Sequence, residues 1–254
     1  MNIIVCVKEV LDVSQIKTDP KSNKPILKGI DKKISDIDKN AVEEAIRIKD
    51  KQGGKVTVIS VGPSESSERI KELLAMGADE AKIIPFEDTQ NYRLVSKILA
   101  GTIKGMGDYD MVLCGEASID MFSGQVAPRL AQLLKIPQIT YAKSVDAQED
   151  KITADKDLGE KKVTVESPYP VVVSVTKEIN EPRLPSLMQI LGAANKPVEM
   201  LDAAVVAEGE LTPTIETVDV KGVSMERKNV IFKDDLDESV NELVDRLAKD
   251  GVLG

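Results

Sequence analysis

The stretch MVLCGEASIDMFSGQVAPRLAQLL, residues 111–134, places a strand pattern, a polar loop and a helix pattern in immediate succession. The apolar residues 111–114 run directly into Gly115, as in a buried strand that ends at a turn. Ser123 and Gly124 then open a helical pattern that continues to about residue 134. A strand followed at once by a helix is typical of a parallel α/β sheet. Because glycine lets a ligand approach the backbone and the first N–H groups of a helix are unpaired, the loop is a candidate anion-binding site.

The same alternation of apolar runs and helical patterns continues through the first two thirds of the chain. The run VTVISV at 56–61 is apolar without interruption, as expected of a strand covered on both faces. The alternation predicts a doubly wound, mostly parallel, Rossmann-like α/β sheet. Charged, alternating residues at 143–166 predict a β-hairpin appended to that sheet. Further strands are expected at 3–7, 81–84, 138–142 and 171–175, and further helices at 38–52, at 91–104 and around Ile70, Leu73 and Leu74.

The last third of the chain has a different texture. Residues 178–201, EINEPRLPSLMQILGAANKPVEML, are rich in proline and contain only one short helical pattern. An irregular linker is expected at about 201–224, followed by a final helix at about 236–249. We therefore expect an α/β domain at 1–200 and a C-terminal arm at 201–254. The apolar stripe of the final helix consists of Leu236, Val240, Leu243, Val244 and Leu247.

Composition and charge exclude several classes of protein. The net charge of −9 argues against nucleic-acid binding, which needs a basic face to replace the counterions of phosphate. An acidic surface serves either solubility alone or attraction to a basic partner. No run approaches the roughly 18 apolar residues of a membrane span, and MNIIVCVKEV at the N-terminus is typical of a strand, not of a signal peptide. Two cysteines in 254 residues indicate a reducing compartment, so we expect a cytoplasmic protein.

The chain contains no histidine. This absence excludes Ser-His-Asp and Cys-His nucleophiles, most zinc sites and the commonest general base. Two cysteines without histidine cannot ligate an iron–sulfur cluster alone. We therefore expect neither a catalytic side chain nor a metal site, and any redox chemistry must come from a bound organic cofactor.

Three segments fall at the carboxyl ends of the predicted strands, where open α/β sheets bind their ligands. They are Cys6–Lys8 after the first strand, Ser35–Asp38 before the first helix, and the loop that begins at Gly115. Lys8 has two interpretations, as a partner for a phosphate or as a solvated edge residue. The three segments together thus predict a ligand site without identifying its ligand.

Individual residues of these segments also have alternative interpretations. Ser123 and Gln125 are candidate side-chain donors to a ligand, but Ser123 fits equally well as a simple helix N-cap. Asp120 either orients the loop or binds a ribose, or it forms an Asx-type turn. Cys6 and Cys114 are expected to be inert, buried thiols.

Several stretches resemble the beta subunits of electron-transfer flavoproteins. The clearest is INEPRLPSLMQILGA at 179–193, which matches the form N-x-P-R-x-x-S of that family. The resemblance covers essentially the whole chain, in order and with the family's spacing. The other matching stretches are VCVKEVLD at 5–12, AVEEAIRIKD at 41–50, LLAMGADEA at 73–81, GEASID at 115–120 and GQVAPRLAQLL at 124–134.

The resemblance implies a heterodimer in which a larger alpha subunit carries an FAD whose ring lies at the interface. The beta subunit holds a second nucleotide, which is AMP in respiratory members and a second FAD in bifurcating members. It also implies electron exchange with a dehydrogenase or quinone reductase and, in bifurcating members, NADH oxidation by the heterodimer. Carried over position by position, the nucleotide site comprises Cys6, Val7, Lys8, Ser35, Asp36, Ile37, Asp38, Val61, Gly115, Glu116, Asp120, Ser123, Gly124, Gln125 and Val126.

The resemblance assigns roles outside the nucleotide site as well. Leu187 and Arg183 fall in a loop at about 178–194 that docks into partner dehydrogenases. Val13 and Ile37 occupy positions near the flavin of the alpha subunit, and the arm at 201–254 packs on that subunit.

The chain also departs from the family's pattern. Ser35-Asp36 stand where the family commonly has Asn-Pro, and VKEVLD stands where bifurcating anaerobic members often read VKQVPD. GEASID, the run at 179–193 and ERKNVIF at 226–232 resemble Fix-type and related anaerobic members, so FAD is expected in the beta site, with AMP as the alternative. A nucleotide-binding sensor of the adenine-nucleotide α-hydrolase type shares the sheet architecture, but it has no use for the proline-rich docking segment.

Overall fold

The computed structural model describes residues 1–207, 209–213, 215–222, 229–233 and 235–253, which form two compact units. The larger unit comprises Met1–Lys17 and Ile26–Asp219, and the smaller comprises Thr18–Pro25 and Val220–Gly254. Residues 201–219, expected from the sequence in the arm, thus group with the larger unit. Of the stretch ERKNVIF, residues 226–228 lie outside the described residues.

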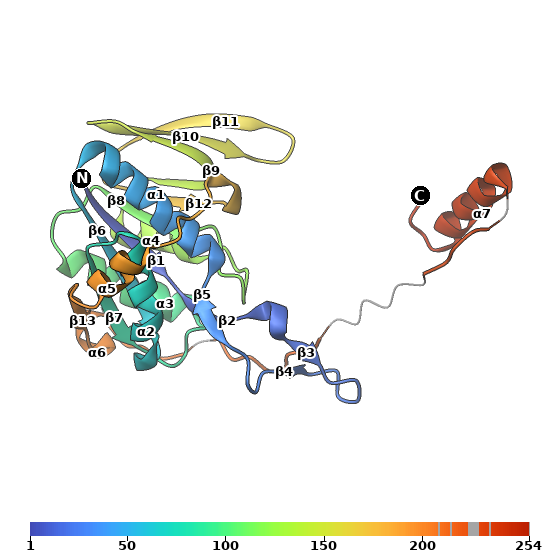
Figure 1. Cartoon of the computed structure of the whole chain (residues 1–254), viewed down its shortest axis with the longest axis horizontal. Coiled ribbons are helices and arrows are strands. Elements are labelled where there is room, and N and C mark those ends of the chain that lie inside the picture. The colour runs from blue at the N-terminus through green and yellow to red at the C-terminus, as the bar shows by residue number, and fades with distance from the viewer. Residues whose placement is uncertain (208, 214, 223–228, 234, 254) are drawn as a thin grey trace. The chain divides into compact units, whose positions relative to one another are not determined.

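A nine-stranded sheet forms the centre of the larger unit (Figure 1). Neighbouring strands from β9 to β13 in the spatial order are parallel, whereas β9, β10 and β11 pair antiparallel. The expected doubly wound, mostly parallel sheet is therefore confirmed, and the expected hairpin extends one edge of it. In spatial order the strands are β11 (Lys162–Pro168), β10 (Lys151–Asp157), β9 (Gln138–Ala147), β12 (Val171–Val175), β8 (Met111–Gly115), β1 (Asn2–Val7), β6 (Lys55–Gly62), β7 (Glu80–Pro85) and β13 (Val198–Met200).

Helices cover both faces of this sheet. Alternate residues of β1 enter two separate cores, with Ile3 and Val5 in one and Ile4 and Cys6 in the other, because successive strand residues point to opposite faces. The first core is closed by α1 (Asp36–Gln52), α2 (Ser67–Met76) and α5 (Leu187–Ala193), and the second by α3 (Tyr92–Gly105), α4 (Val126–Leu134) and α6 (Ala203–Val206).

The pattern of α1 shows how the sequence produces this packing. Ala41, Val42 and Ala45 recur at helical spacing and are fully buried against the sheet, as the periodicity predicts. The helix ends at Gln52, before Gly53, whose φ of 73° lies in the left-handed region that favours glycine. The helix begins two residues earlier than expected, so Asp36 and Asp38 both lie in its first turn.

The order of the strands reverses between β1 and β8. From β1 the chain moves outward through β6 and β7, and then returns to place β8 on the other side of β1. The carboxyl ends of the two strands diverge into loops that run in opposite directions over the sheet, which leaves a crevice for a ligand at this switch point.

Two expectations about local structure are wrong. Helix α4 begins at Val126, not at residue 124, because Gly124 has a φ of 61° that no right-handed helix accommodates. The residue before the helix is Gln125, so Ser123 is not its N-cap. The elements that the sequence did not predict are the short ones: β2 (Glu9–Leu11) pairing with β5 (Lys32–Ile34), β3 (Lys17–Thr18) pairing with β4 (Pro25–Ile26), the edge strand β13, the helix α6, and the one-turn helices Val13–Gln15, Ser64–Ser66 and Lys177–Ile179.

The smaller unit contains the predicted final helix, α7 (Leu236–Lys249). Asp235 caps its start by accepting hydrogen bonds from the N–H groups of Asp237 and Glu238. Arg246 lies over the ring of Phe232, with its Cζ 5.6 Å from the ring centroid, within the limit of about 6 Å for a cation–π contact. Along the described residues, no helix has both the length and the apolar character needed to cross a bilayer.

Candidate functional site

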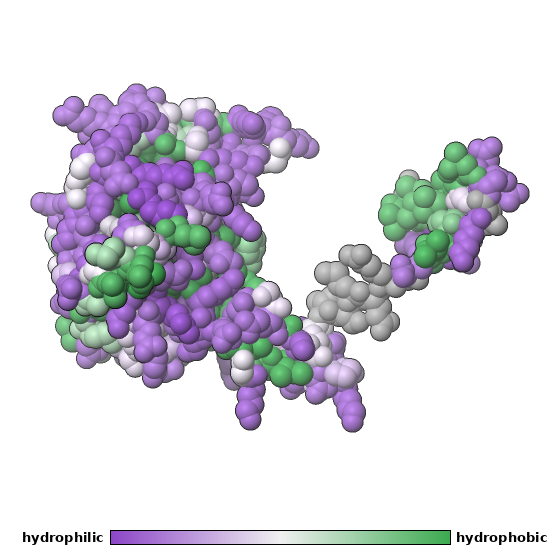
Figure 2. Space-filling model, in the orientation of Figure 1, coloured by the Kyte–Doolittle hydropathy of each residue, from purple (hydrophilic) through white to green (hydrophobic). Residues whose placement is uncertain are grey.

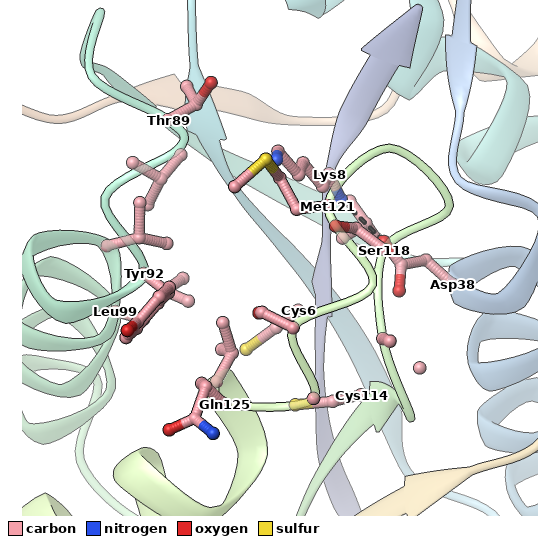
Figure 3. Close-up of a pocket in the computed structure, with 18 of the residues that line it drawn as sticks. Cys6, Lys8, Asp38, Thr89, Tyr92, Leu99, Cys114, Ser118, Met121 and Gln125 are labelled. Carbon is pink, nitrogen blue, oxygen red and sulfur yellow. Dashed lines mark hydrogen bonds between the residues drawn. The ribbon is translucent and has the colours of Figure 1, made fainter. Parts of the chain in front are cut away.

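A pocket lies at the switch point of the sheet, at the carboxyl ends of β1 and β8 (Figure 3). It holds about 690 Å³ of empty space, part of which is open to solvent. Figure 3 shows Tyr92 and Leu99 on the wall opposite Lys8, Ser118 and Asp38. Eleven residues expected at the nucleotide site line the pocket, namely Cys6, Val7, Lys8, Asp38, Val61, Gly115, Glu116, Ser123, Gly124, Gln125 and Val126.

The four other expected residues lie behind or beside this lining. The Ser35 N–H donates to the carbonyl of Lys8 at 2.9 Å, and Ile37 is buried. Asp36 points to Lys33, whose ammonium donates to its carboxylate at 2.9 Å. Asp120 contacts the pocket through Lys8. These residues therefore support the walls of the pocket, and none of them lines it.

Asp38 fastens the two strand ends together. Its Oδ2 accepts a hydrogen bond from the backbone N–H of Lys8 at 2.8 Å, and its carboxylate also accepts one from the N–H of Gly115. Burial raises the pKa of Asp38 to about 7, although the two N–H donors and the charge of Lys8 lower it in part. A carboxyl group at the first turn of α1 thus binds the backbone on both sides of the switch point.

The absence of a side chain at Gly115 makes this arrangement possible. A Cβ at this position would lie 2.4 Å from Oδ1 of Asp38 and 3.2 Å from its backbone nitrogen. Neither atom can withdraw without losing the contact between α1 and β8. The glycine at the end of the predicted strand is therefore required by Asp38 and not only by a ligand.

Lys8 carries the cationic charge on the pocket wall. Its ammonium donates to Oδ2 of Asp120 at 2.7 Å, and the two side chains are 18% and 23% exposed. Asp120 Oδ1 also accepts the N–H of Met121 at 2.8 Å, which holds the loop after β8 over the pocket. In this arrangement the carboxylate of Asp120 is the anionic partner of Lys8.

The start of α4 supplies hydrogen-bond donors to the same pocket. No side chain caps the helix, so its first N–H groups have no protein partner of that kind. Gln125 and Val126, the residues at this helix start, line the pocket. Unpaired N–H groups and the helix dipole together favour an anion, and Gly124 leaves room for its approach.

One wall of the pocket was missed by sequence analysis. Thr89 and Gln90 come from the loop after β7, and Tyr92, Val95 and Leu99 come from α3. The position of this loop could have been predicted, because it follows a predicted strand and so lies at the carboxyl edge of the sheet. Arg129 of α4 supports this wall, with its Cζ 5.0 Å from the centroid of the Tyr92 ring.

The two cysteines lie side by side at the floor of the pocket. Cys6 of β1 and Cys114 of β8 are partners in the strand register, and both are buried, free thiols. A hydrogen bond with Cys6, together with burial, raises the pKa of Cys114, so this thiol stays protonated at neutral pH. A protonated thiol is a poor nucleophile, which agrees with the interpretation of these cysteines as inert.

The two expected docking residues, Leu187 and Arg183, differ in their exposure and contacts. Leu187 is 71% exposed, so it does not belong to the core of this chain. Arg183 binds the buried carboxylate of Glu43 through Nε at 2.8 Å. Val13, expected near the alpha-subunit flavin, is 40% exposed.

Among the described residues, no group of three or more Asp, Glu or Cys side chains is arranged to hold a metal ion.

The fold and pocket define a doubly wound α/β protein with a pocket at the topological switch point. Residues 26–206 match the electron transfer flavoprotein domain family. The chain is 39% identical to the electron transfer flavoprotein subunit beta of Thermoanaerobacterium thermosaccharolyticum, over 97% of this chain and 98% of that protein. It is 37% identical to the subunit of the same name from Megasphaera elsdenii, over 82% of this chain and 80% of that one.

A third relative bears a more specific name. The caffeyl-CoA reductase-Etf complex subunit CarD of Acetobacterium woodii is 34% identical, over 78% of this chain and 77% of that protein. The chain therefore belongs to the electron transfer flavoprotein family, as a beta subunit. Beta subunits of this family function with an alpha subunit and involve a flavin, and the sensor interpretation is not supported.

Proposed function

We propose that this chain, paired with an alpha subunit, holds an FAD in its own pocket. With the FAD of the alpha subunit, it passes electrons between a dehydrogenase or NADH and an acceptor. The observation that carries the proposal is the pocket at the switch point, which both Lys8 and the uncapped start of α4 line. A cation and unpaired N–H groups in one cavity fit the phosphates of a nucleotide.

The residues present fit such a ligand at both ends. Val61, Val95 and Leu99, with Tyr92 beside them, form an apolar wall suited to a planar base. Lys8, Ser123 and Val126 line the same pocket, and a cation, a hydroxyl and a helix start are groups suited to a phosphate. A bound flavin supplies the redox chemistry, and the protein binds it, orients it and tunes its surroundings. With no histidine in the chain, proton transfer by imidazole is absent from this site.

FAD is favoured over AMP by likeness to particular relatives. GEASID and the run at 179–193 resemble Fix-type and anaerobic members, as does ERKNVIF, of which residues 226–228 lie outside the described residues. The A. woodii relative is named as part of a reductase–Etf complex. If FAD occupies the beta site, electrons from a two-electron donor such as NADH can be divided between two flavins.

Nucleotide content tests this proposal directly. The heterodimer, made by co-expression with its alpha subunit, is denatured, and the released nucleotides are separated and counted against protein. Two FAD per heterodimer and no AMP are expected, after correction for flavin lost in purification. One FAD and one AMP would mean that the chain is a scaffold for a single flavin, and would overturn both the FAD assignment and bifurcation.

The exposed apolar residues of α5, together with Leu184 just before the helix, form the proposed docking surface for a dehydrogenase or quinone reductase. Leu184, Leu187 and Met188 are 93%, 71% and 77% exposed, and Figure 2 shows a hydrophobic patch where Figure 1 places α5. Apolar patches of this kind on a surface rich in charge mark protein contacts. The arm at 201–254 is proposed to pack on the alpha subunit through the apolar stripe of α7.

A further inference from the structure

Helix α1 buries polar side chains on the face that it turns away from the sheet. Asn40, Glu43 and Glu44 are only 3%, 2% and 8% exposed, although acidic and amide side chains are normally found in water. They are covered by the segment that joins β12 to α5. A buried carboxylate is costly unless it is paired, so these residues must have partners in that segment.

Asn180 is the first of these partners. Its amide nitrogen donates to the carbonyl of Asn40 at 3.0 Å and to Oε2 of Glu44 at 2.9 Å. In return, Nδ2 of Asn40 donates to the carbonyl of Asn180 at 2.7 Å. The side chains therefore hold the backbone of the segment against the middle of α1.

Arg183 is the second partner and the stronger one. Its Nε and Nη2 donate to the two oxygens of Glu43 at 2.8 and 3.2 Å, and its backbone N–H donates to the same carboxylate at 3.1 Å. Nη1 also reaches Asp50 at 3.1 Å. Burial alone would raise the pKa of Glu43, but the hydrogen bonds from Arg183 outweigh it and hold the pKa below its usual value. Such forked pairing fixes direction as well as distance.

The far end of the segment is fastened to a different helix. The ammonium of Lys196 donates to the carbonyls of Leu74 and Ala78, at 2.9 and 2.7 Å. These carbonyls lie at and just beyond the end of α2, where a helix leaves its acceptors unpaired. Lys196 thus closes α2 and fixes the chain that leaves α5.

Helix α5 lies between these two anchors and buries very little of itself. Ser186 and Gln189 form a reciprocal capping box at its start, and Ala193 is its one buried residue, at 3% exposure. A seven-residue helix with so little burial does not persist on local hydrogen bonds alone. The anchors on α1 and α2 therefore account for its fixed place on the surface.

We propose that Arg183 and Lys196 are positioning residues, which hold α5 in the geometry in which its apolar side chains meet the partner. The inference rests on the docking function proposed above for Leu187. Arg183 then acts through Glu43 and does not itself contact the partner. A segment held in place before binding loses less conformational freedom on docking, so the anchors strengthen the complex.

The test measures docking and anchor separately, in the assembled heterodimer. Electron exchange with the partner dehydrogenase is followed over a range of dehydrogenase concentrations, and reduction of a small dye corrects for flavin content. Arg183→Met should raise KM for the dehydrogenase about tenfold with little change in kcat. Arg183→Lys, which keeps the charge but loses the forked pairing, should have a KM between those of the natural chain and Arg183→Met.

Two companion variants keep the outcome interpretable. Arg183→Met leaves Glu43 buried with less pairing and risks misfolding, so Glu43→Gln with Arg183→Met removes the anchor without an unpaired charge. Lys151→Met removes the ion pair with Glu166, which joins β10 to β11 at the edge of the sheet farthest from β13, and serves as the matched control. Hydrogen exchange at residues 186–194 should accelerate in the double variant and not in the control.

The possible results separate the two proposals. An increase of KM in both Leu187→Ala and the Arg183 variants, with faster exchange in α5, supports the positioning role. An increase of KM in Leu187→Ala alone would support docking through α5 and overturn the positioning role of Arg183. No increase in any variant would show that α5 does not dock, and both proposals would fall together.

Discussion

The carboxylate of Asp38 accepts the backbone N–H of Lys8 at 2.8 Å and so joins the first turn of α1 to the end of β1. The same carboxylate accepts the N–H of Gly115 at the end of β8. A single side chain therefore spans the point where the order of the strands reverses. The shape of the pocket depends on this contact, because both strand ends contribute to its lining.

The ionisation of Asp38 should make stability depend on pH. Its pKa is about 7 in the folded protein against 3.8 for the free side chain. Because the folded value is the higher one, the stabilising contribution of the protonated carboxyl is fully present below pH 3.8 and is lost as the pH rises through 7. Asp38→Asn removes this dependence. Between acidic and mildly alkaline pH, the free energy of unfolding should fall by up to about 4 kcal/mol more for the natural chain than for the variant.

Urea unfolding of both heterodimers at a fixed protein concentration, across this pH range, gives the comparison. Other groups titrate equally in the two proteins and cancel in the difference. Parallel stability profiles would show that Asp38 is ionised at all of these pH values and that its burial is compensated by the two N–H donors.

Gly115→Ala should damage the same contact from the other side. The new methyl group would sit 2.4 Å from Oδ1 of Asp38, so the helix or the strand must move. We expect a loss of about 1–3 kcal/mol in unfolding free energy, with loss of bound nucleotide. Gly105→Ala at the end of α3 is the control, since a Cβ there meets nothing within 4 Å. Equal stability of the two variants would contradict the proposed close packing at Gly115.

The sequence was sufficient for every strand of the large sheet except β13 and for most of the pocket, but not for the roles of the residues. Uninterrupted apolar runs identify β1 and β8 directly, because strands that are buried on both faces are apolar throughout. Gly115 marks the end of β8. The contact of Asp38 with two strand ends depends on tertiary distances that no local pattern encodes. Tyr92 was missed for a related reason, since it reaches the pocket from a helix whose own periodicity only reports burial. Gly124 misled the prediction of α4, because glycine permits a helix start and a left-handed turn alike.

Lys8 should contribute to nucleotide retention through its charge. If it binds a phosphate, Lys8→Met should weaken nucleotide affinity about tenfold or more, as expected when a charge-assisted hydrogen bond is lost. Asp120→Asn should act in the opposite direction, because it frees Lys8 from its partner at 2.7 Å. Affinities measured by equilibrium dialysis of the heterodimer distinguish the possibilities. Unchanged affinity in Lys8→Met would favour a solvated edge residue, and weaker binding in Asp120→Asn would favour a ribose contact of Asp120.

Leu187→Ala should weaken electron delivery to the partner dehydrogenase while leaving the flavin spectrum unchanged. An apolar anchor at the centre of a small interface is often worth about 2 kcal/mol, or roughly thirtyfold in KM. The control is Leu158→Ala at the tip of the hairpin, where the leucine is 57% exposed and has no proposed partner. Loss of flavin or of solubility in Leu187→Ala, in place of a higher KM, would indicate a structural role.

The stripe along α7 should be required for assembly with the alpha subunit. Leu236, Val240 and Leu243 are 78%, 48% and 43% exposed, and none of the residues of α7 is buried within this chain. An amphipathic helix with an uncovered apolar side is stable when a partner covers that side. The chain alone should therefore be flavin-poor and prone to associate, since obligate interfaces are apolar and exceed about 2,000 Å².

Leu243→Asp would place a charge in that interface and should weaken the heterodimer by about 3 kcal/mol. Asp245→Asn, on an exposed position of the same helix, should leave assembly unchanged. Sedimentation of mixed subunits over a range of concentrations measures both effects. A monodisperse, stable monomer of this chain at micromolar concentration, together with full assembly of Leu243→Asp, would show that α7 serves some purpose other than the subunit interface.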